Sequence, residues 1–523
     1  MTRDATVGPL ERGLAVLRAM SGTEVSRASE LTRETGLARS TVDRVLATLV
    51  RLGYVREADR SVRLAPPLLE LGNAYLAGSG LPDALGPLAE RLAGEFDESV
   101  SVAVPDGDGV RFVTQITRRR TMSPAFRIGD LLPAERCAPG ALFAAGWTDG
   151  DWDRWRSAEG GTAVPRTPEA EPDFRRRAAG SARGWAEDDQ LIEPGLIAVA
   201  VPVRDASGRV VCAVSVVSHT SRHTIGSLAG RVLPRLRAAV PVLAAEARGA
   251  RRPGAAGVDP ARGVKEEAGA EFLQSLARGL AVLARLGDER GGLTLAEAAE
   301  ATGLARATAR RSLLTLAGLG YVAQAGRRFA ALPRVLELGY ARLSSMGFGE
   351  VVHPHLAGLM ERVRESVSMA VLDGTEIRYI ARVSAYRIMS VDITVGSRLP
   401  AYATSMGRVL LAGLGPERRA GALARTPPRP LTRRTRIDLD AVLDEVAEGG
   451  YAFVDEELEE GLRSLAVPVR DCAGRVVAAV NVATHAARGT AAETLAALLP
   501  ELTETAHRIE ADLRLMPDFR DLP

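Results

Sequence analysis

Residues 36–55 read GLARSTVDRVLATLVRLGYV, and residues 303–322, which lie 267 positions later, read GLARATARRSLLTLAGLGYV. In both segments apolar residues recur at the spacing of an amphipathic helix, directly after a turn that opens with glycine. Just upstream of the second segment, Thr294 and Glu297 have the spacing of a capping box, and Gly303 suits the left-handed residue that ends a helix. The pattern predicts two short helices joined by a tight turn, once in each copy.

The second helix of each pair is expected to bury one face and to expose arginines and short hydroxyl residues on the other. The expected buried positions are Val42, Leu46 and Leu49 in the first copy and Ala309, Leu313 and Leu316 in the second. The expected exposed positions are Arg39, Ser40, Thr41 and Arg44 in the first copy and Arg306, Thr308, Arg310 and Arg311 in the second. Short strands follow at Tyr54 and Tyr321 and return through Arg63, and through Arg327 and Arg328, which predicts a wing beside each helix pair.

Positive charge is concentrated in these two segments. The chain has a formal net charge of only +2, yet residues 36–65 hold six arginines against three acids, and residues 303–332 hold five arginines and no acid. Such a helix fits the major groove of DNA, where arginine donates two hydrogen bonds to guanine. We therefore expect double-stranded DNA as a partner, contacted by the exposed residues and the wing arginines named above. Because Asp43 stands where Arg310 stands, the two winged helix-turn-helix heads are expected to prefer unequal half-sites, and the second to bind more strongly.

The repeat extends through the whole chain. LLELGNAYL at Leu68 matches VLELGYARL at Val335, and ESVSVAV at Glu98 matches ESVSMAV at Glu365. The match continues at an offset of 266, which we attribute to one residue gained in the loop that holds Pro194. The expected bounds are 1–78 and 271–345 for the two heads, 79–248 and 346–515 for two effector domains, 249–270 for a flexible linker and 516–523 for a tail.

Each effector domain is expected to be an α+β domain. β-branched runs at residues 101–104, 110–116, 197–203 and 210–217 predict strands, with a hairpin turn at residues 205–208. Helices are expected at 82–96 and 140–146, so an antiparallel sheet with helices packed on it is the simplest assembly.

Composition narrows the class of protein. The chain is 46% hydrophobic and 25% charged, contains no long apolar run, and shows no secretory signal, so a cytoplasmic protein without a membrane partner is expected. Cys137, Cys212 and Cys472 lack metal-ligand spacing, and no cofactor or metal is predicted. An enzyme is disfavoured because nucleophile-elbow, P-loop and zinc-protease motifs are absent and the sole lysine, Lys265, lies in the linker. A ligand sensor whose heads are vestigial and act through protein contacts stays open.

The sequence resembles the IclR family of bacterial regulators, once per half. RIMSVDITVGSRLPAYATSMGRVLLA, VDEELEEGLRSLAVPVRD and VVAAVNVATHAAR in the second half resemble the branch that controls protocatechuate and β-ketoadipate catabolism. The resemblance implies a winged helix-turn-helix joined by a helix to a GAF-like effector-binding domain, dimerisation on a palindromic operator, and control by small organic acids. With two heads in one chain, an intramolecular pseudo-dimer or a homo-oligomer is expected.

The resemblance also implies the effector-contacting positions. In the second half they are Met389, Ser405, Met406, Asp455, Ser464, Asn481 and Ala483. Convergent polar groups amid apolar walls suit an aromatic or dicarboxylic acid, for which Arg382 or Arg387 would supply the counter-charge. The matching positions of the first half are Ala138, Pro139, Asp188, Ala198, Ser215 and Val217. Polar atoms have been lost there, so the first domain is expected to bind a different ligand or none.

Overall fold

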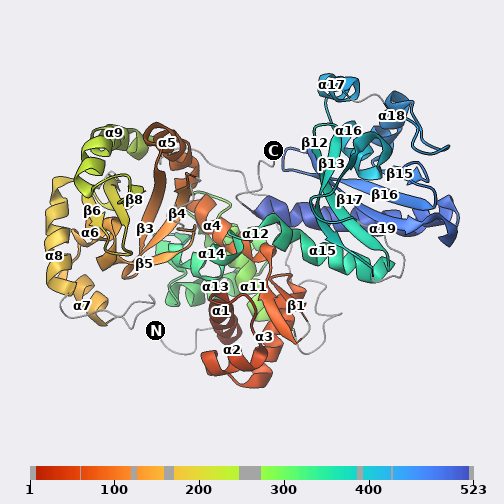
Figure 1. Ribbon diagram of the computed structural model, residues 1–523. Coiled ribbons are helices and arrows are strands. Elements are labelled where there is room, and N and C mark those ends of the chain that lie inside the picture. Colours follow the sequence, from red (N-terminus) through yellow and green to blue (C-terminus); the bar gives the residue numbers. More distant parts are fainter. Residues whose placement is uncertain are drawn as a thin grey trace. The chain divides into compact units, whose positions relative to one another are not determined.

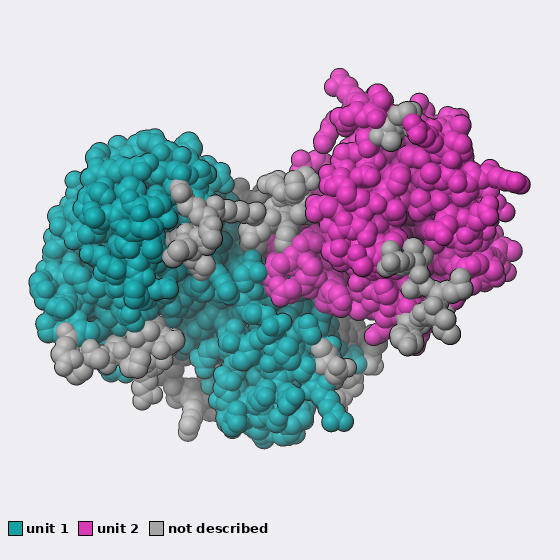
Figure 2. All heavy atoms as spheres, viewed as in Figure 1, with its two compact units in different colours: residues 1–345 teal, residues 346–523 magenta. Residues whose placement is uncertain are grey.

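The computed structural model describes residues 7–58, 60–118, 126–157, 170–205, 207–246, 272–385, 393–425 and 428–516. The chain divides into two compact units, residues 1–345 and 346–523 (Figure 2). The first unit contains both heads and the first effector domain, and the second unit contains the second effector domain. The linker expected at 249–270 lies outside the described residues, as does the tail beyond Met516.

Both heads have the winged helix-turn-helix architecture predicted from the sequence. The first consists of α1 (Gly8–Ser21), α2 (Ala28–Thr35), α3 (Arg39–Arg51), β1 (Val55–Ala58) and β2 (Ser61–Leu64). The second consists of α11 (Gln274–Arg285), β9 (Leu293–Thr294), α12 (Leu295–Thr302), α13 (Arg306–Gly318), β10 (Val322–Ala325) and β11 (Arg328–Ala331). The predicted capping box of Thr294 and Glu297 is present, and Gly303 has a φ of 64°. The six residues expected on the inner faces of α3 and α13 are all buried, which confirms the predicted helical register.

A connecting segment follows each wing. In the first copy it is η2 (Pro66–Leu68) and α4 (Leu69–Ser79), and in the second it is η6 (Pro333–Glu337) and α14 (Tyr340–Leu343). The expected joining helix is therefore continuous in the first copy, whereas in the second it is interrupted at Gly339, which has a φ of 95°.

The first effector domain is built on a six-stranded antiparallel sheet of order β5-β4-β3-β8-β7-β6. The strands are β3 (Ser99–Asp106), β4 (Gly109–Ile116), β5 (Leu131–Pro133), β6 (Ala186–Asp189), β7 (Leu196–Arg204) and β8 (Val210–His219). The helices are α5 (Leu81–Phe96), η3 (Ala134–Arg136), α6 (Ala138–Ala144), α7 (Asp149–Ser157), α8 (Ala170–Gly180), η4 (Ser181–Arg183) and α9 (Ile225–Glu246). The predicted antiparallel α+β fold is confirmed.

The second effector domain repeats this sheet in the order β14-β13-β12-β17-β16-β15. Its strands are β12 (Ser366–Asp373), β13 (Glu376–Val383), β14 (Arg398–Pro400), β15 (Ala452–Asp455), β16 (Leu462–Arg470) and β17 (Val476–His485). Its helices are α15 (Phe348–Val363), η7 (Ala401–Ala403), α16 (Ser405–Ala412), α17 (Pro416–Arg425), α18 (Leu439–Gly449), η8 (Ala486–Arg488) and α19 (Ala491–Leu515). In Figure 1, α15 and α19 lie side by side against the sheet. Helix α16 packs on the sheet through the cluster that contains Ala370, Ala466 and Ala479.

The strand register corrects one alignment made from the sequence. β6 pairs Asp188 with Ala198, whereas β15 pairs Val454 with Ser464. The residues after these strands, Gln190 and Glu456, both have a φ near 60° and lie 266 positions apart. The loop that holds Pro194 therefore has the same length in both copies, and the extra residue lies upstream of it. The counterpart of Asp455 is Asp189, and Asp188 takes the position of Val454.

None of the helices in the described parts of the chain is long and apolar enough to cross a membrane.

Candidate effector sites and nucleic-acid interface

A polar row crosses one face of the sheet in the second effector domain. The register places Ala466 opposite Asn481, Asn481 opposite Ser368, and Ser368 opposite Arg382. Residues paired in this way project from the same face, and Ala466 packs there with α16. Arg382 Nη1 donates to Ser368 Oγ at 3.3 Å, and Asn481 Oδ1 is buried without a hydrogen-bond partner among the described residues. Because an unsatisfied buried amide oxygen is costly, the row is suited to a ligand that donates to it.

Two hydroxyl groups lie beside this row. Ser464 Oγ donates to Ser405 Oγ at 2.8 Å, and joins β16 to the first residue of α16. Thr404 caps the helix by accepting from the Gly407 N–H at 3.1 Å. The start of α16 therefore lies beside the polar row, where its positive dipole end favours a negatively charged group.

Burial also affects the cation of the row. Desolvation lowers the pKa of Arg382, and the nearby Tyr379 opposes that shift. Burial in turn raises the pKa of Tyr379 to about 12. Arg382 is thus a partly desolvated guanidinium, whose attraction for a carboxylate is stronger than that of a fully hydrated one.

A buried ion pair fixes the loop after β15. Arg408 of α16 donates to both carboxylate oxygens of Glu457, at 2.8 and 2.6 Å, and its Nε donates to Tyr402 O at 2.8 Å. Arg408 is 1% exposed and Glu457 is 5% exposed. Sequence reasoning assigned the acidic residues after Asp455 no such partner. The pair was missed because Arg408 and Glu457 are 49 positions apart and neither residue type predicts burial.

The structure brings most of the predicted effector residues together. Ser405, Met406, Ser464, Asn481 and Ala483 gather on or under the face covered by α16. Asp455 is directed elsewhere, because it accepts from Arg463 at 2.7 Å and Arg463 in turn reaches Thr494 of α19. Met389 and Arg387 lie outside the described residues. Ser368 belongs to the row but was not predicted, although its segment ESVSMAV is repeated in both halves.

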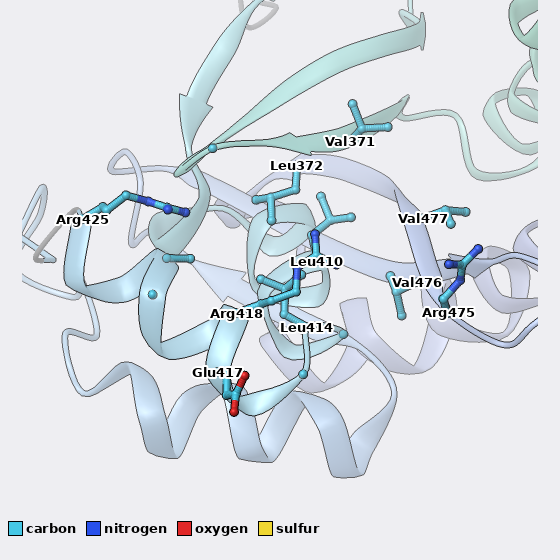
Figure 3. A pocket seen from close by; sticks show the side chains of 15 residues that line it. Val371, Leu372, Leu410, Leu414, Glu417, Arg418, Arg425, Arg475, Val476 and Val477 are labelled. Atoms are coloured by element: carbon cyan, nitrogen blue, oxygen red, sulfur yellow. The ribbon is translucent and has the colours of Figure 1, made fainter. Parts of the chain in front are cut away.

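A surface groove of about 730 Å³ lies elsewhere on the same domain (Figure 3). It runs along the C-terminal end of α16, where Leu410 and Leu414 face α17 and the β17 residue Val476. Arg418 and Arg425 of α17 line it, but none of the predicted effector residues does. The groove and the polar row are therefore separate features.

In the first effector domain the same row has other side chains. Ser215 is opposite Ser101, and Ser101 is opposite Gln115, which replaces Arg382. Both hydroxyl oxygens and both amide atoms of Gln115 are buried without a partner in the described part of the chain. Ala138, Pro139, Ala198 and Val217 take the positions of Ser405, Met406, Ser464 and Ala483. The hydroxyl pair of the second domain is thus absent at these positions, while the row itself remains polar.

The two heads expose different charges on their second helices. Arg39, Ser40 and Arg44 of α3 are exposed, and Thr41 is half-buried. Arg39 forms an ion pair with Asp43 at 2.9 Å, one helical turn away. On α13, Arg306, Arg310 and Arg311 are exposed and Thr308 is half-buried. The exposed surface of α13 is therefore more positive than that of α3.

The wing arginines also differ in their surroundings. Arg63 of β2 is half-buried, and Arg327, in the turn between β10 and β11, is exposed. Arg328 is directed inward, since its Nη1 lies 3.3 Å from the Glu289 carboxylate and donates to Gly292 O. Of the wing residues proposed for DNA, Arg327 is thus the most accessible.

The heads pack against each other through α1 and α11, which lie side by side in Figure 1. A Cβ atom on Gly13 would lie 2.3 Å from Leu276 Cδ1, and one on Gly279 would lie 2.4 Å from Leu10 Cδ2. The two helices therefore approach closely only because each carries glycine at the crossing. The repeated motif RGLAVL, at residues 12–17 and 278–283, was the available sequence signal for this contact.

Two hydrogen bonds repeat this symmetry. The Val7 N–H donates to Thr315 Oγ1 and the Leu273 N–H donates to Thr48 Oγ1, both at 3.0 Å. In each head, a threonine of the second helix-turn-helix helix thus accepts a hydrogen bond from the residue that directly precedes the first helix of the other head. The arrangement is a pseudo-two-fold pair of heads within one chain.

Comparisons with protein families match the repeat. The family described as the IclR helix-turn-helix domain matches residues 9–59 and 275–326. The family described as bacterial transcriptional regulator IclR C-terminal matches residues 73–244 and 340–511. The tandem duplication of both domains is therefore established.

Individual relatives match about half of this chain. The Pca regulon regulatory protein of Pseudomonas putida is 44% identical over 236 residues, which are 44% of this chain and 81% of that protein. The p-hydroxybenzoate hydroxylase transcriptional activator of Acinetobacter baylyi is 33% identical, over 46% of this chain and 91% of that protein. A solved structure, a putative transcriptional regulator from Rhodococcus, is 50% identical with a TM-score of 0.45, and covers 48% of this chain and 100% of its own. These relatives are named as regulators and not as enzymes.

Proposed function

Because the chain belongs to the IclR family of bacterial transcriptional regulators, we propose that it binds operator DNA through two heads paired within one chain, under the control of a small organic acid. The acid binds in the second effector domain. The protein acts in the cytoplasm, where its operator is.

The observation that carries the choice of ligand is the polar row of the second effector domain. Arg382 supplies a partly desolvated cation, and the start of α16 adds a positive dipole end. Asn481 Oδ1 is a buried acceptor that a ligand hydroxyl can satisfy, and Ser405 and Ser464 offer two more hydroxyls. Cation, acceptor and hydroxyls together suit an aromatic or dicarboxylic acid with a further polar substituent. Hydroxybenzoates are the first acids to test, since one relative is named for p-hydroxybenzoate.

The pairing of α1 with α11 supports DNA binding by a single chain. A two-fold pair of recognition helices suits a palindromic operator, and the duplicated sequence supplies both members of the pair. Arg39, Ser40, Thr41, Arg44 and Arg63 of the first head and Arg306, Thr308, Arg310, Arg311, Arg327 and Arg328 of the second are the proposed DNA contacts. An acid can then change DNA affinity by favouring one arrangement of the heads.

Calorimetry of the full chain with 4-hydroxybenzoate and with dicarboxylic acids tests the ligand proposal. Arg382→Gln, which installs the residue of the first domain, is expected to weaken binding of the acid by about tenfold or more. Arg378→Gln is the control, because Arg378 is an exposed arginine of the same strand. Equal affinities of the two variants would contradict the role of Arg382.

Gel-shift titration against fragments of the source genome tests the DNA proposal. One chain is expected to occupy both half-sites of the operator. The double variant Gly13→Leu/Gly279→Leu is expected to weaken DNA binding by about tenfold or more, because the added side chains force α1 and α11 apart. Gly94→Leu serves as the control, because a Cβ there meets nothing within 4 Å. If full-length protein shifts no fragment at low salt, the alternative of vestigial heads acting through protein contacts replaces this proposal.

A further inference from the structure

We propose that the first effector domain is a second ligand site, and that it selects an uncharged aromatic molecule bearing hydrogen-bonding groups and rejects carboxylates. The inference rests on the proposed function, because it assigns a ligand class to the other copy of the same domain. It is carried by the row of Ser101, Gln115 and Ser215 and by the buried carboxyl of Asp188.

The row offers donors and acceptors but no cation. Ser101 is fully buried and Ser215 is 2% exposed, and the hydroxyl oxygens of both have no partner among the described residues. Gln115, opposite Ser101, presents an amide nitrogen and an amide oxygen that are likewise buried and unpartnered there. Four unsatisfied polar atoms on one sheet face are unusual in a folded domain, and a bound polar molecule would satisfy them. An amide and two hydroxyls satisfy neutral groups as well as charged ones, whereas Arg382 in the second domain favours an anion.

Asp188 adds a buried carboxyl group to the same face. It is paired with Ala198, and Ala198 is paired with Val217, so its side chain projects on the face that carries Ser215 in the adjacent row. It is 2% exposed, and its Oδ1 accepts from the Leu191 N–H at 2.8 Å. The corresponding residue of the second domain is Val454. A ligand carboxylate would thus meet an acid where the second domain has an apolar side chain.

Three further charged groups act on Asp188. Arg177 of α8 and Arg136 of η3 attract its carboxylate, and Asp189 repels it. Arg136 donates to Leu191 O and Ile192 O, and Arg177 donates through Nη2 to Glu135 O, while Arg177 Nη1 is buried without a partner among the described residues. Burial outweighs the two arginines and raises the pKa of Asp188 to about 7. Neither arginine belongs to the row itself, where Gln115 stands in place of Arg382.

An aromatic wall lies over this region. Phe126 stacks on Phe112 with ring centroids 4.9 Å apart and planes inclined by 7°. Phe126 also packs against Ala198 and Val217, beside the row. A flat ring fits against such a wall through its face, and its polar substituents can then reach the row.

The chain allows the two domains to be read separately. All four tryptophans, Trp147, Trp152, Trp155 and Trp185, belong to the first effector domain. Full-length protein titrated with 4-hydroxybenzamide and with 4-hydroxybenzoate compares two ligands that differ in charge but hardly in shape. We expect the amide to change tryptophan fluorescence with an affinity about tenfold or more higher than that of the acid. If Arg382→Gln abolishes the calorimetric heat of acid binding, that heat comes from the second domain. The fluorescence response reports the first domain, so the failure of one proposal is distinguishable from the failure of the other.

Variants sharpen the test. Gln115→Arg with Asp188→Val installs the residues of the second domain and is expected to reverse the preference, whereas Ser101→Ala, a smaller change, is expected to weaken amide binding about fivefold. Arg382→Gln should leave the fluorescence response unchanged. An acid that binds the first domain as tightly as the amide overturns the proposal, and so does the absence of any response to the amide up to about 10 mM.

Discussion

The two effector domains share a strand order and differ in the charges that they bury. The second holds its β15–β16 loop by a side-chain ion pair, Arg408 with Glu457. The first holds the corresponding β6–β7 loop by Arg136, which donates to Leu191 O at 2.8 Å and Ile192 O at 3.1 Å. Ala141 and Leu191 occupy the positions of Arg408 and Glu457. Both domains thus hold this loop with an arginine, but the arginine comes from a different position in each domain.

The largest expected effect comes from splitting the buried pair. Arg408→Ala leaves Glu457 buried without its partner and is expected to destabilise the second effector domain by about 3–5 kcal/mol. Adding Glu457→Leu removes the unpaired buried acid and should recover most of that loss. Unfolding followed by far-ultraviolet circular dichroism measures both variants, and tryptophan emission, which reports the first domain, should stay unchanged. If the double variant is no more stable than Arg408→Ala, the loss does not come from the unpaired charge of Glu457.

Exchanging charges between the recognition helices has the next largest effect. Arg310→Asp on α13 is expected to lower affinity for DNA about tenfold to hundredfold and to make the salt dependence less steep. Asp43→Arg on α3 should raise affinity, because it removes an acid and releases Arg39 from its ion pair. Fluorescence anisotropy at several salt concentrations measures both changes. An unchanged affinity in both variants would contradict the proposed inequality of the two heads.

Asp188→Asn probes the buried acid of the first domain. Because the pKa of Asp188 is raised to about 7, ionising this carboxyl in the folded protein is costly, and the cost grows from its unfolded pKa near 4 up to pH 7. The variant should therefore be more stable than the native protein by about 2 kcal/mol at pH 8, with the difference shrinking toward pH 4. Denaturant unfolding followed by tryptophan emission measures it. A difference that does not vary with pH would mean that Asp188 does not titrate in this range.

The smallest expected effect tests the symmetry of the heads. Thr48→Val and Thr315→Val each remove the hydroxyl that accepts a backbone N–H from the other head. Each is expected to cost about 1 kcal/mol, a typical value for one hydrogen bond. Thermal unfolding compares the two. Markedly unequal losses would break the pseudo-two-fold relation that the structure indicates.

Much of the fold was predictable from residue patterns. Apolar spacing gave α3 and α13, the Thr294 capping box gave the start of α12, and β-branched runs gave the central strands of the sheet, because each of these depends on local propensity and periodicity. Five of the seven predicted effector residues lie together. Asp455 does not join them because the side chain of Arg463, across the β15–β16 ladder, draws it away.

One motif shows where the sequence alone reaches its limit. LELG occurs at residues 69–72 and again at 336–339. In the first copy it lies within α4, but in the second the helix is interrupted at Gly339, whose φ is 95°. A Cβ on Gly72 would lie 2.1 Å from Tyr340 Cδ2, and one on Gly339 would lie 2.4 Å from Leu64 Cδ1, so each glycine is packed against the other copy.

The sequence by itself thus determined the duplication, the helix-turn-helix pairs, the antiparallel sheets and the concentration of arginine on the heads, because these follow from patterns within a few residues of one another. Only the tertiary structure decided that the heads pair through Gly13 and Gly279, that Asp188 faces the row of Ser215, and that Arg408 meets Glu457. Those contacts join residues far apart in the chain. The local sequence does not determine which distant residues will meet, because that depends on how the elements pack.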